Sequence, residues 1–279
     1  MKAPRFSYAR PASVADALGL LAEHGDNARV LAGGQSLMPM LNLRVATPRV
    51  LVDINRIAGL SGVTVAKDHV RIGALTRHAE LERSMDIARH LPLIAKAMPH
   101  VAHAAIRTRG TFGGSCALAD PAAELPACSL ALGAIFVIAG AKGERRVPAA
   151  EFFRGLYATA IAANEILVAA EFPLSKPGYA SAFGELARRH GDYAMVGVAA
   201  HGLIADGKFS DLRIVFFGVA EQPLRATKLE QALNGQPSTA IDSAIAALEI
   251  ETRGDLQTSA ATKKHLARVL AGRVLKELK

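Results

Sequence analysis

The chain has 279 residues, of which 51% are hydrophobic and 21% are charged, and its formal net charge is +8. This composition excludes a wholly disordered chain, and the length predicts two globular domains of ordinary size. The positive charge is compatible with nucleic-acid binding. However, the basic residues are scattered and there is no tryptophan for base stacking, so no nucleic-acid partner is expected.

Membrane, secretion and metal signals are weak. The longest uncharged run, 125–141, is shorter than the roughly 20 apolar residues that cross a bilayer, so no membrane span is expected. The N-terminal residues contain no apolar segment of signal-peptide length, which predicts a cytoplasmic location. Cys116 and Cys128 do not form a C-x-x-C pair and are expected to be reduced thiols. His100 and His103 lack a third ligand, so no metal site is expected.

The first part of the chain alternates helices with short apolar strands. A helix is predicted over 14–24, because Ser13 and Asp16 form a capping box and Gly25 suits a C-cap. Pro39 is expected to break any helix in 36–44. The remaining predictions are strands over 29–32, 50–54, 63–66, 69–73, 134–139, 145–147 and 165–172, with 63–73 as a hairpin, and helices over 77–84, capped by Thr76, and over 87–98.

A domain boundary is predicted at Lys176-Pro177-Gly178, because a Pro-Gly pair follows an apolar strand there. The domains are therefore predicted as 1–177 and 178–279. In the second domain we expect strands over 181–186, 194–204 and 210–219, followed by helices over 225–233, 240–248 and 260–278. This order predicts an α+β domain with a helix layer on one face of an antiparallel sheet.

Two stretches carry adjacent glycines in a polar, uncharged setting: LAGGQSL at 31–37 and IRTRGTFGGSCALAD at 106–120. Adjacent glycines let successive N–H groups converge on an anion, because no Cβ intervenes. Taken alone, each pair is more typical of a tight connection between strands, but two pairs together weaken that interpretation. We therefore expect two turns that hold one diphosphate from two sides, with Arg107 and Arg109 able to neutralise it.

The sequence gives little support for a known nucleotide-binding motif or for a catalytic nucleophile. Neither G-x-G-x-x-G nor G-x-x-x-x-G-K-[ST] occurs in the sequence. Ser36 and Ser115 have no adjacent histidine, so no hydrolase nucleophile is expected. Tyr193 could stack on a planar ring, although a tyrosine at the start of a strand more often belongs to the core or its rim. The residues favour chemistry carried by a bound cofactor, with no catalytic residue in the chain itself.

Nearly the whole chain resembles a known family, the FAD-binding medium subunits of molybdenum hydroxylases such as carbon monoxide dehydrogenase and xanthine dehydrogenase. The resemblance is carried by LAGGQSLMPMLNLR at 31–44, LVDINRI at 51–57, IRTRGTFGGSCALADPAAELPA at 106–127, EILVAAEFP at 165–173 and RRHGDYAMVGVAA at 188–200. It implies an α+β fold, in which a two-lobed FAD-binding domain of the PCMH type precedes a smaller C-terminal domain with an antiparallel sheet and helices.

The resemblance also implies which residues bind FAD. In such proteins two loops hold the pyrophosphate, an acidic residue and a strand backbone contact the cofactor, and a tyrosine lies beside the isoalloxazine. The matching positions are Leu31, Ala32, Gly33, Gly34, Gln35, Ser36 and Leu37 in the first loop, Thr111, Phe112, Gly113, Gly114 and Ser115 in the second, Glu124 with Asp120 in the same segment, Leu167 in the strand, and Tyr193.

Three positions depart from the family pattern. Phe112 replaces a more usual aliphatic residue, and Ser115 replaces a common asparagine. Gly184-Glu185 stands where many relatives place a lysine near the flavin. The last departure leaves open which group stabilises anionic reduced flavin, and an arginine at 188 or 189 is a candidate.

An electron-transfer subunit is the function that the resemblance implies. In such complexes a large subunit oxidises the substrate at a molybdenum cofactor, and a small subunit carries two [2Fe–2S] clusters. FAD in the medium subunit passes the electrons to an external acceptor, and the assembly is a dimer of heterotrimers. The alternatives are a stand-alone FAD-dependent oxidoreductase and a scaffold subunit whose flavin site has decayed.

Overall fold

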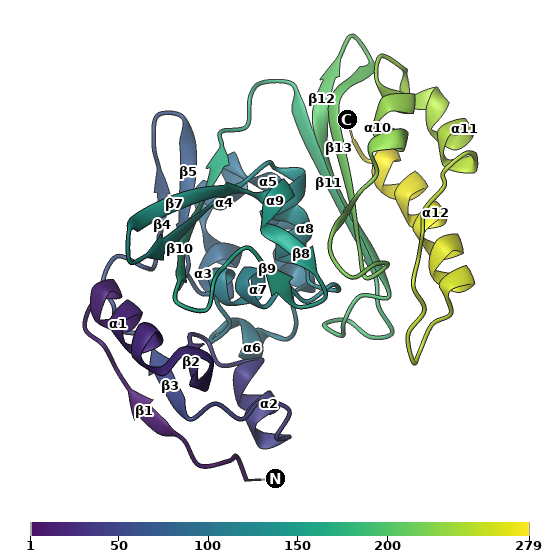
Figure 1. The fold of residues 1–279 in the computed structure, drawn as a ribbon. Helices are drawn as coiled ribbons and strands as arrows, with labels where there is room; N and C mark the ends of the chain where they lie inside the picture. Colours follow the sequence, from purple (N-terminus) through teal and green to yellow (C-terminus); the bar gives the residue numbers. More distant parts are fainter. Residues whose placement is uncertain (1, 279) are drawn as a thin grey trace.

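The computed structural model describes residues 2–278, which fold as two lobes followed by a C-terminal domain (Figure 1). The first lobe is a parallel sheet in the order β1-β3-β2, formed by β1 (Ser7–Ala9), β2 (Ala28–Leu31) and β3 (Val50–Asp53). Helix α1 (Val14–His24) packs on this sheet. Its predicted capping box is confirmed, because Ser13 and Asp16 each accept from the other's backbone N–H at 3.1 Å.

A short helix, α2 (Leu37–Asn42), follows β2 and shows that the break expected at Pro39 is wrong. Pro39 is the third residue of this helix. Backbone N–H groups in the first turn have no intrahelical acceptor, so a proline there removes no hydrogen bond. The Gly34 carbonyl oxygen accepts from the N–H of Met38 at 3.0 Å, which joins the helix start to the loop before it.

The second lobe contains a five-stranded antiparallel sheet in the order β4-β5-β10-β6-β7. Its first two strands, β4 (Val63–Val65) and β5 (His69–Gly73), confirm the predicted hairpin. The other strands also match predicted ones and are β6 (Ile135–Gly140), β7 (Gly143–Pro148) and β10 (Ile166–Pro173). One face of the sheet packs on the first lobe, through an apolar cluster that joins Val52 to Val137 and Val168.

Helices cover the other face of this sheet. The elements of this layer are α3 (His78–Arg83), α4 (Met85–His90), α5 (Pro92–Ala97), α7 (Phe112–Leu118), α8 (Glu124–Ala131) and α9 (Ala149–Phe152), with a small hairpin of β8 (Phe153–Gly155) and β9 (Ala158–Thr159). The short helix α6 (Ala104–Arg107) has no buried residue and lies against α3.

Two helix boundaries in this layer differ from the prediction. The single helix expected over 87–98 is broken at Leu91, which has a φ of −132°, because Pro92 disfavours helical geometry in the residue before it. The N-cap residue of α3 is Arg77 rather than Thr76. The Thr76 hydroxyl instead donates to a loop carbonyl oxygen at 3.0 Å.

The C-terminal domain is an antiparallel sheet in the order β11-β12-β13-β14, and its three long strands and three helices were predicted. These elements are β11 (Tyr179–Leu186), β12 (Val196–Ala205), β13 (Lys208–Phe217), β14 (Leu224–Arg225), α10 (Thr227–Leu233), α11 (Ile241–Ala246) and α12 (Ala260–Lys276). The C-terminal helices pack on one face. Helices α5 and α8 cover the other face, around Phe183 and Phe217, so both faces are covered rather than the single one predicted.

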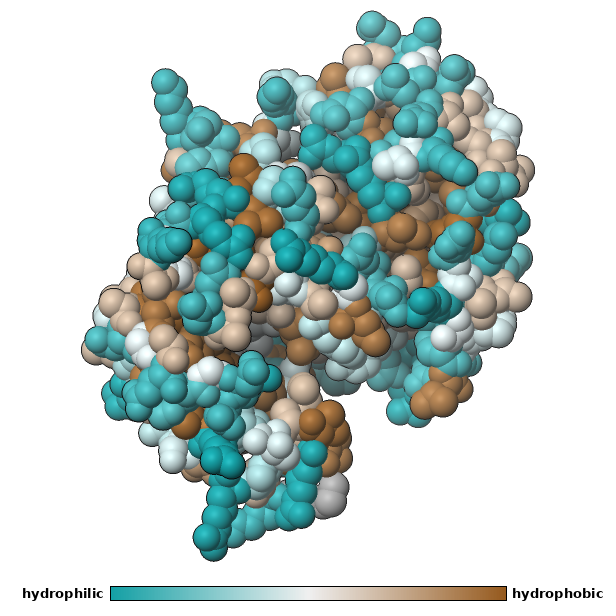
Figure 2. Space-filling model, in the orientation of Figure 1, coloured by the Kyte–Doolittle hydropathy of each residue, from teal (hydrophilic) through white to brown (hydrophobic). Residues whose placement is uncertain are grey.

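Hydrogen bonds join this domain to the second lobe. The Gly218 N–H donates to the Pro121 carbonyl oxygen at 2.7 Å, and Lys96 Nζ donates to the Ser181 carbonyl oxygen at 2.8 Å. A notch separates the C-terminal domain from the first lobe (Figure 2), and Figure 1 places α7 and the β8–β9 hairpin between these two parts.

Candidate functional site

The loop between β2 and α2 carries the first glycine pair and offers free hydrogen-bond donors. Gly34 has a φ of 74°, a left-handed conformation that glycine adopts without steric cost. Within residues 2–278, the backbone N–H groups of residues 33–36 donate to no acceptor. Successive free N–H groups of this kind can bind an anion. The loop therefore has the donors that the sequence predicted.

The two glycine stretches lie in direct contact. A Cβ added to Gly33 would stand 2.3 Å from the Arg109 carbonyl oxygen and 3.0 Å from the Cα of Gly110. Only glycine permits two backbones to approach this closely. The contact supports one shared site. Beside it lies a hollow of about 490 Å³, lined by Leu31, Ala32, Gly33, Gly34, Gln35, Met38, Pro39, Asn42 and Arg109.

Two side chains outside the predicted set hold this contact in place. Asn55 Nδ2 donates to the Ala32 carbonyl oxygen at 2.7 Å, and Asn55 Oδ1 accepts from the Arg77 guanidinium at 2.7 Å. The same guanidinium donates to the Arg109 carbonyl oxygen. Asp53 orients this network, because its Oδ1 accepts from the Asn55 backbone N–H at 2.9 Å. Part of the network lies in the LVDINRI segment, which is the signal that could have revealed it.

The second stretch begins helix α7, so the turn expected here is wrong. Thr111 is the N-cap residue, and its Oγ1 accepts from the Gly114 N–H at 3.1 Å. The Gly113 N–H donates to the Ala74 carbonyl oxygen at 2.8 Å. Both glycine N–H groups are thus bonded within the chain and do not form the predicted nest of free donors. A threonine hydroxyl at this spacing is a strong N-cap and favours a helix over a turn.

Close packing explains why two glycines lie in the first turn of α7. A Cβ on Gly113 would lie 2.5 Å from the Ala74 Cβ, so the absence of a side chain lets α7 rest on the segment after β5. A Cβ on Gly114 would lie 2.7 Å from Thr111 Oγ1 and would meet only one other atom within 4 Å, at 3.9 Å. Gly114 therefore leaves open space in front of the helix start.

Three of the residues expected at the site point elsewhere. Phe112 is fully buried and packs edge-on against a phenylalanine of β10, with ring centroids 5.9 Å apart, so this departure repacks the core. The Leu167 side chain is 5% exposed and belongs to the same apolar cluster, which leaves only its backbone for a cofactor contact. Arg107 is bonded to Glu82 at 2.9 Å and to two carbonyl oxygens, so it is not free to neutralise a phosphate.

Buried carboxyls lie beyond α7, where the second lobe meets the C-terminal domain. Glu124, the first residue of α8, is 8% exposed, and burial with the nearby Asp120 raises its pKa to about 7. Glu185 on β11 has a buried Oε2 without a hydrogen-bond partner. Burial and then the Glu124 charge raise the pKa of Glu185 to about 8. At least one of these two carboxyls therefore keeps its proton near neutral pH.

The two residues at the expected lysine position lie in different environments. Gly184 faces the C-terminal helices, because a Cβ there would lie 2.7 Å from Val274 Cγ2. Glu185 faces Glu124 instead. Tyr193 is 74% exposed. Burial of part of the side chain raises its pKa, and so do the charges of Asp120 and Glu124, which places Tyr193 near these two carboxyls. The position where many relatives have a lysine is therefore occupied by the acidic residue Glu185. The two candidate arginines, at 188 and 189, are exposed.

Replacing Glu185 with glutamine is expected to stabilise the chain at alkaline pH but not at acidic pH. The folded chain holds this proton more tightly than the unfolded chain, because folding raises the pKa from 4.5 to about 8. The resulting stability is fully present below the unfolded pKa and is lost as pH rises through the folded pKa. Glutamine avoids that loss, so the free energy of unfolding should rise by about 1–2 kcal/mol near pH 9 after allowance for partial exposure.

Thermal or urea unfolding at about pH 5 and pH 9 measures this difference. Glu277→Gln, at an exposed position of the C-terminal end, is the control for the loss of one surface charge. A gain in stability that is equal at both pH values would contradict the buried, protonated state of Glu185.

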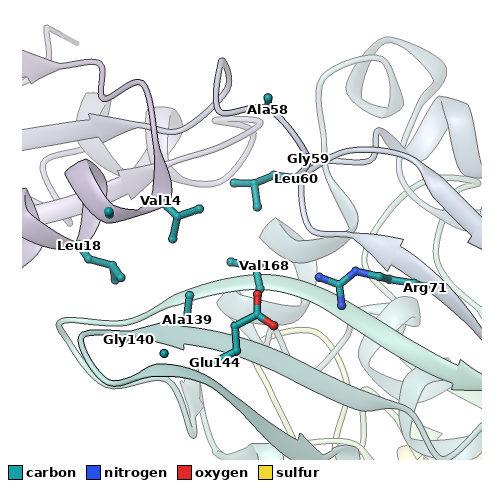
Figure 3. Close-up of a pocket in the computed structure, with 12 residues that line it drawn as sticks. Val14, Leu18, Ala58, Gly59, Leu60, Arg71, Ala139, Gly140, Glu144 and Val168 are labelled. Carbon is teal, nitrogen blue, oxygen red and sulfur yellow. The ribbon is translucent and has the colours of Figure 1, made fainter.

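A second hollow, of about 390 Å³, lies away from these residues (Figure 3). It is bounded by Val14 and Leu18 of α1, Leu60 and the β6–β7 hairpin. Arg71 on its rim is bonded to Glu171 at 3.0 Å. None of the candidate site residues lines this hollow, so it is not part of the predicted site.

Two family models together match almost the whole chain. One, described as the FAD binding domain in molybdopterin dehydrogenase, matches residues 4–175, and the other, the CO dehydrogenase flavoprotein C-terminal domain, matches residues 181–278. The chain belongs to the FAD-binding medium subunits of molybdenum hydroxylases. The expected fold class and the resemblance noted from the motifs are confirmed.

Named relatives of this medium subunit agree. The 6-hydroxypseudooxynicotine dehydrogenase complex subunit alpha of Paenarthrobacter nicotinovorans is 42% identical over 248 residues, which cover 88% of this chain and 84% of the relative. The carbon monoxide dehydrogenase medium chain of Hydrogenophaga pseudoflava is 40% identical over 260 residues, covering 90% and 91%. A solved carbon monoxide dehydrogenase from Hydrogenophaga pseudoflava matches with a TM-score of 0.94 and 39% identity, covering 100% of this chain and 98% of that one.

The residues present in this medium subunit fit FAD. A diphosphate requires convergent donors and positive charge, and the free N–H groups of 33–36 beside Arg109 supply both. Among residues 2–278, no group of side chains is arranged to hold a metal ion. In the same part of the chain, no helix has the length and apolar character needed to cross a membrane. Cys116 and Cys128 are buried free thiols.

Proposed function

We propose that this medium subunit is the electron-transfer subunit of a molybdenum hydroxylase complex. The observation that carries the proposal is the contact at Gly33, which places the free N–H groups of residues 33–36 beside Arg109. When bound, FAD supplies the electron-carrying chemistry between a partner's [2Fe–2S] clusters and an external acceptor. The chain itself has only two cysteines, too few for a cluster, which agrees with clusters held by another subunit.

The residues that would hold FAD form three groups. The loop 31–37, with Arg109, would take the pyrophosphate, because it has the free donors and the positive charge. The segment Thr111–Ser115 would border it, since Gly114 leaves space in front of α7. Asp120, Glu124, Tyr193 and the Leu167 backbone would make the remaining contacts. In this arrangement the protein binds and orients the cofactor and carries no acid–base catalyst of its own.

The names of the relatives support a proposal for the assembly. Several are named as medium chains or subunits of dehydrogenase complexes, among them carbon monoxide dehydrogenase. We propose a large subunit with the molybdenum cofactor and a small subunit with [2Fe–2S] clusters as partners, in a dimer of heterotrimers. On this proposal the large subunit selects the substrate. A cytoplasmic location remains a prediction.

Flavin absorbance in the isolated chain and in the reconstituted complex tests the electron-transfer role. A substrate of the complex is expected to bleach the flavin only when the partner subunits are present, whereas a chemical reductant bleaches it in the isolated chain as well. Bleaching by substrate in the isolated chain would establish a stand-alone oxidoreductase. A colourless chain that takes up no added FAD, yet still joins the complex, would establish a scaffold.

Replacing Tyr193 with alanine is expected to loosen FAD without releasing it. The substitution removes an exposed aromatic ring but none of the N–H donors of residues 33–36. A ring contact is worth about 0.5–1.5 kcal/mol, so the dissociation constant should rise about twofold to tenfold. Titration of the apo-chain with FAD measures the change, and Tyr193→Phe, which keeps the ring, is the control. Complete loss of FAD, or unaltered affinity, would contradict this role for Tyr193.

A further inference from the structure

The β8–β9 hairpin exposes two large side chains at its tip. Leu156 and Tyr157 join the strands and are 55% and 56% exposed. Tyr157 has a φ of 52°, in the left-handed region that residues with bulky side chains seldom occupy. Gly155, two residues earlier, also has a positive φ, of 139°, which glycine adopts without steric cost. A two-residue hairpin turn calls for a positive φ, so the turn fixes this backbone conformation and holds Tyr157 at the tip.

The Tyr157 side chain faces the acidic end of the candidate site. Its hydroxyl donates to Asp120 Oδ2 at 3.4 Å. Burial and then the Asp120 charge raise the pKa of Tyr157, and Tyr193 contributes to the same shift. Asp120 also contributes to the raised pKa of Tyr193, after burial. Two tyrosines, one from this hairpin and one from the loop between β11 and β12, therefore share one carboxylate neighbour.

The exposed ring of Tyr157 does not hold the hairpin in place. Phe152 and Phe153, at the start of the hairpin, do so: both are buried, and their rings pack edge-on at 5.0 Å. Tyr157 and Tyr193 instead leave more than half of their surface exposed. Exposed tyrosine rings offer apolar faces that suit a planar aromatic ligand. The Tyr157 ring is therefore free to contact a ligand beside Asp120.

We infer that Tyr157 is a second aromatic residue of the FAD site, which acts with Tyr193 to position the flavin ring system. The inference rests on the function proposed above. The hydrogen bond to Asp120 holds the phenol beside the connection between α7 and α8, where the Pro121 carbonyl oxygen accepts from Gly218 of the C-terminal domain. Asp120 then serves as the group that orients Tyr157.

FAD titration and the fluorescence of bound flavin test this role in the full chain. A phenol ring near flavin quenches flavin fluorescence by electron transfer, so the spectrum reports the ring and not the fold. Tyr157→Leu is expected to raise the fluorescence of bound FAD and to weaken binding about threefold to tenfold. Tyr157→Phe keeps the ring and should retain most of the affinity. Tyr157→Gly should lose affinity without loss of thermal stability, because glycine adopts this φ freely.

Tyr179→Phe is the matched control for the phenol. It removes a hydroxyl that donates to Asp211 at 2.7 Å. Tyr179 begins β11, whereas Glu185 lies near the other end of that strand, so the substitution should change neither the affinity for FAD nor the fluorescence of bound FAD. Wild-type affinity together with unchanged fluorescence in Tyr157→Leu would overturn the inference and leave the proposed function intact. A wild-type chain that takes up no FAD would overturn both.

Discussion

Valine at position 33 is expected to abolish FAD retention. A Cβ there would stand 2.3 Å from the Arg109 carbonyl oxygen and 3.0 Å from the Gly110 Cα, and these backbone atoms cannot rotate aside. The loop must therefore move away from Arg109, together with the free N–H groups of 33–36. Loss of only two hydrogen bonds to a charged phosphate, at about 1.5 kcal/mol each, already weakens binding by about a hundredfold.

The flavin content of the purified chain and FAD titration of the apo-chain measure this effect. Gly19→Val is the control, because Gly19 is exposed on α1 and a Cβ there would meet nothing within 4 Å. Thermal melts separate loss of the site from loss of the fold, and Gly33→Ala introduces the same Cβ without the two methyl groups of valine. Full flavin content in Gly33→Val would contradict the contact between the two glycine stretches.

Valine at position 114 is expected to release FAD by a different route. Its Cβ would lie 2.7 Å from Thr111 Oγ1, so the Thr111 side chain must rotate and give up its bond to the backbone N–H. Loss of an N-cap costs about 1 kcal/mol of stability. The two methyl groups of valine then fill the space in front of α7, where the proposal places the cofactor.

Two further variants separate these effects at Gly114. Thr111→Ser keeps the capping hydroxyl and is expected to retain FAD, whereas Thr111→Val removes the cap without filling the space. Gly19→Val again controls for valine in a helix. Normal FAD affinity in Gly114→Val would show that the start of α7 does not border the cofactor.

Elements whose signals are local were predictable from the sequence. The capping box of Ser13 and Asp16 fixes the start of α1, because both of its hydrogen bonds lie within four residues. Apolar patterns and turn residues likewise identified the β4–β5 hairpin, the long C-terminal strands and the helices after them. The short strands β1, β8, β9 and β14 are not predicted, because two or three residues carry no usable period. The equally short β4 is predicted only through its turn to the longer β5.

Errors arose where a residue's position within an element decides its effect. Pro39 was expected to break a helix, but it lies in the first turn of α2, where its missing N–H costs nothing. Pro92 was placed inside a helix, although it begins a new one. Adjacent glycines at 113 and 114 favour a turn, but the Thr111 side chain caps a helix that includes both of them.

The candidate site was predicted in outline but not in its contacts. The first glycine stretch has the expected free donors, since they depend on local backbone geometry. The link from Asn55 and Arg77 to both stretches depends on residues far apart in the sequence, as do the proximity of Glu124 to Glu185 and the bond from Tyr157 to Asp120. Such contacts follow from the packing of lobes and not from any local pattern.

Competition between ADP and FAD for the apo-chain tests most directly that the two glycine stretches form one diphosphate site. ADP carries the diphosphate without the flavin, so it should displace FAD from the wild-type chain. Tyr193→Ala should weaken FAD but leave ADP affinity unchanged, and Gly33→Val should lose both ligands while keeping a cooperative thermal transition. A folded wild-type chain that binds FAD without competition from ADP, or binds no FAD, would contradict the account.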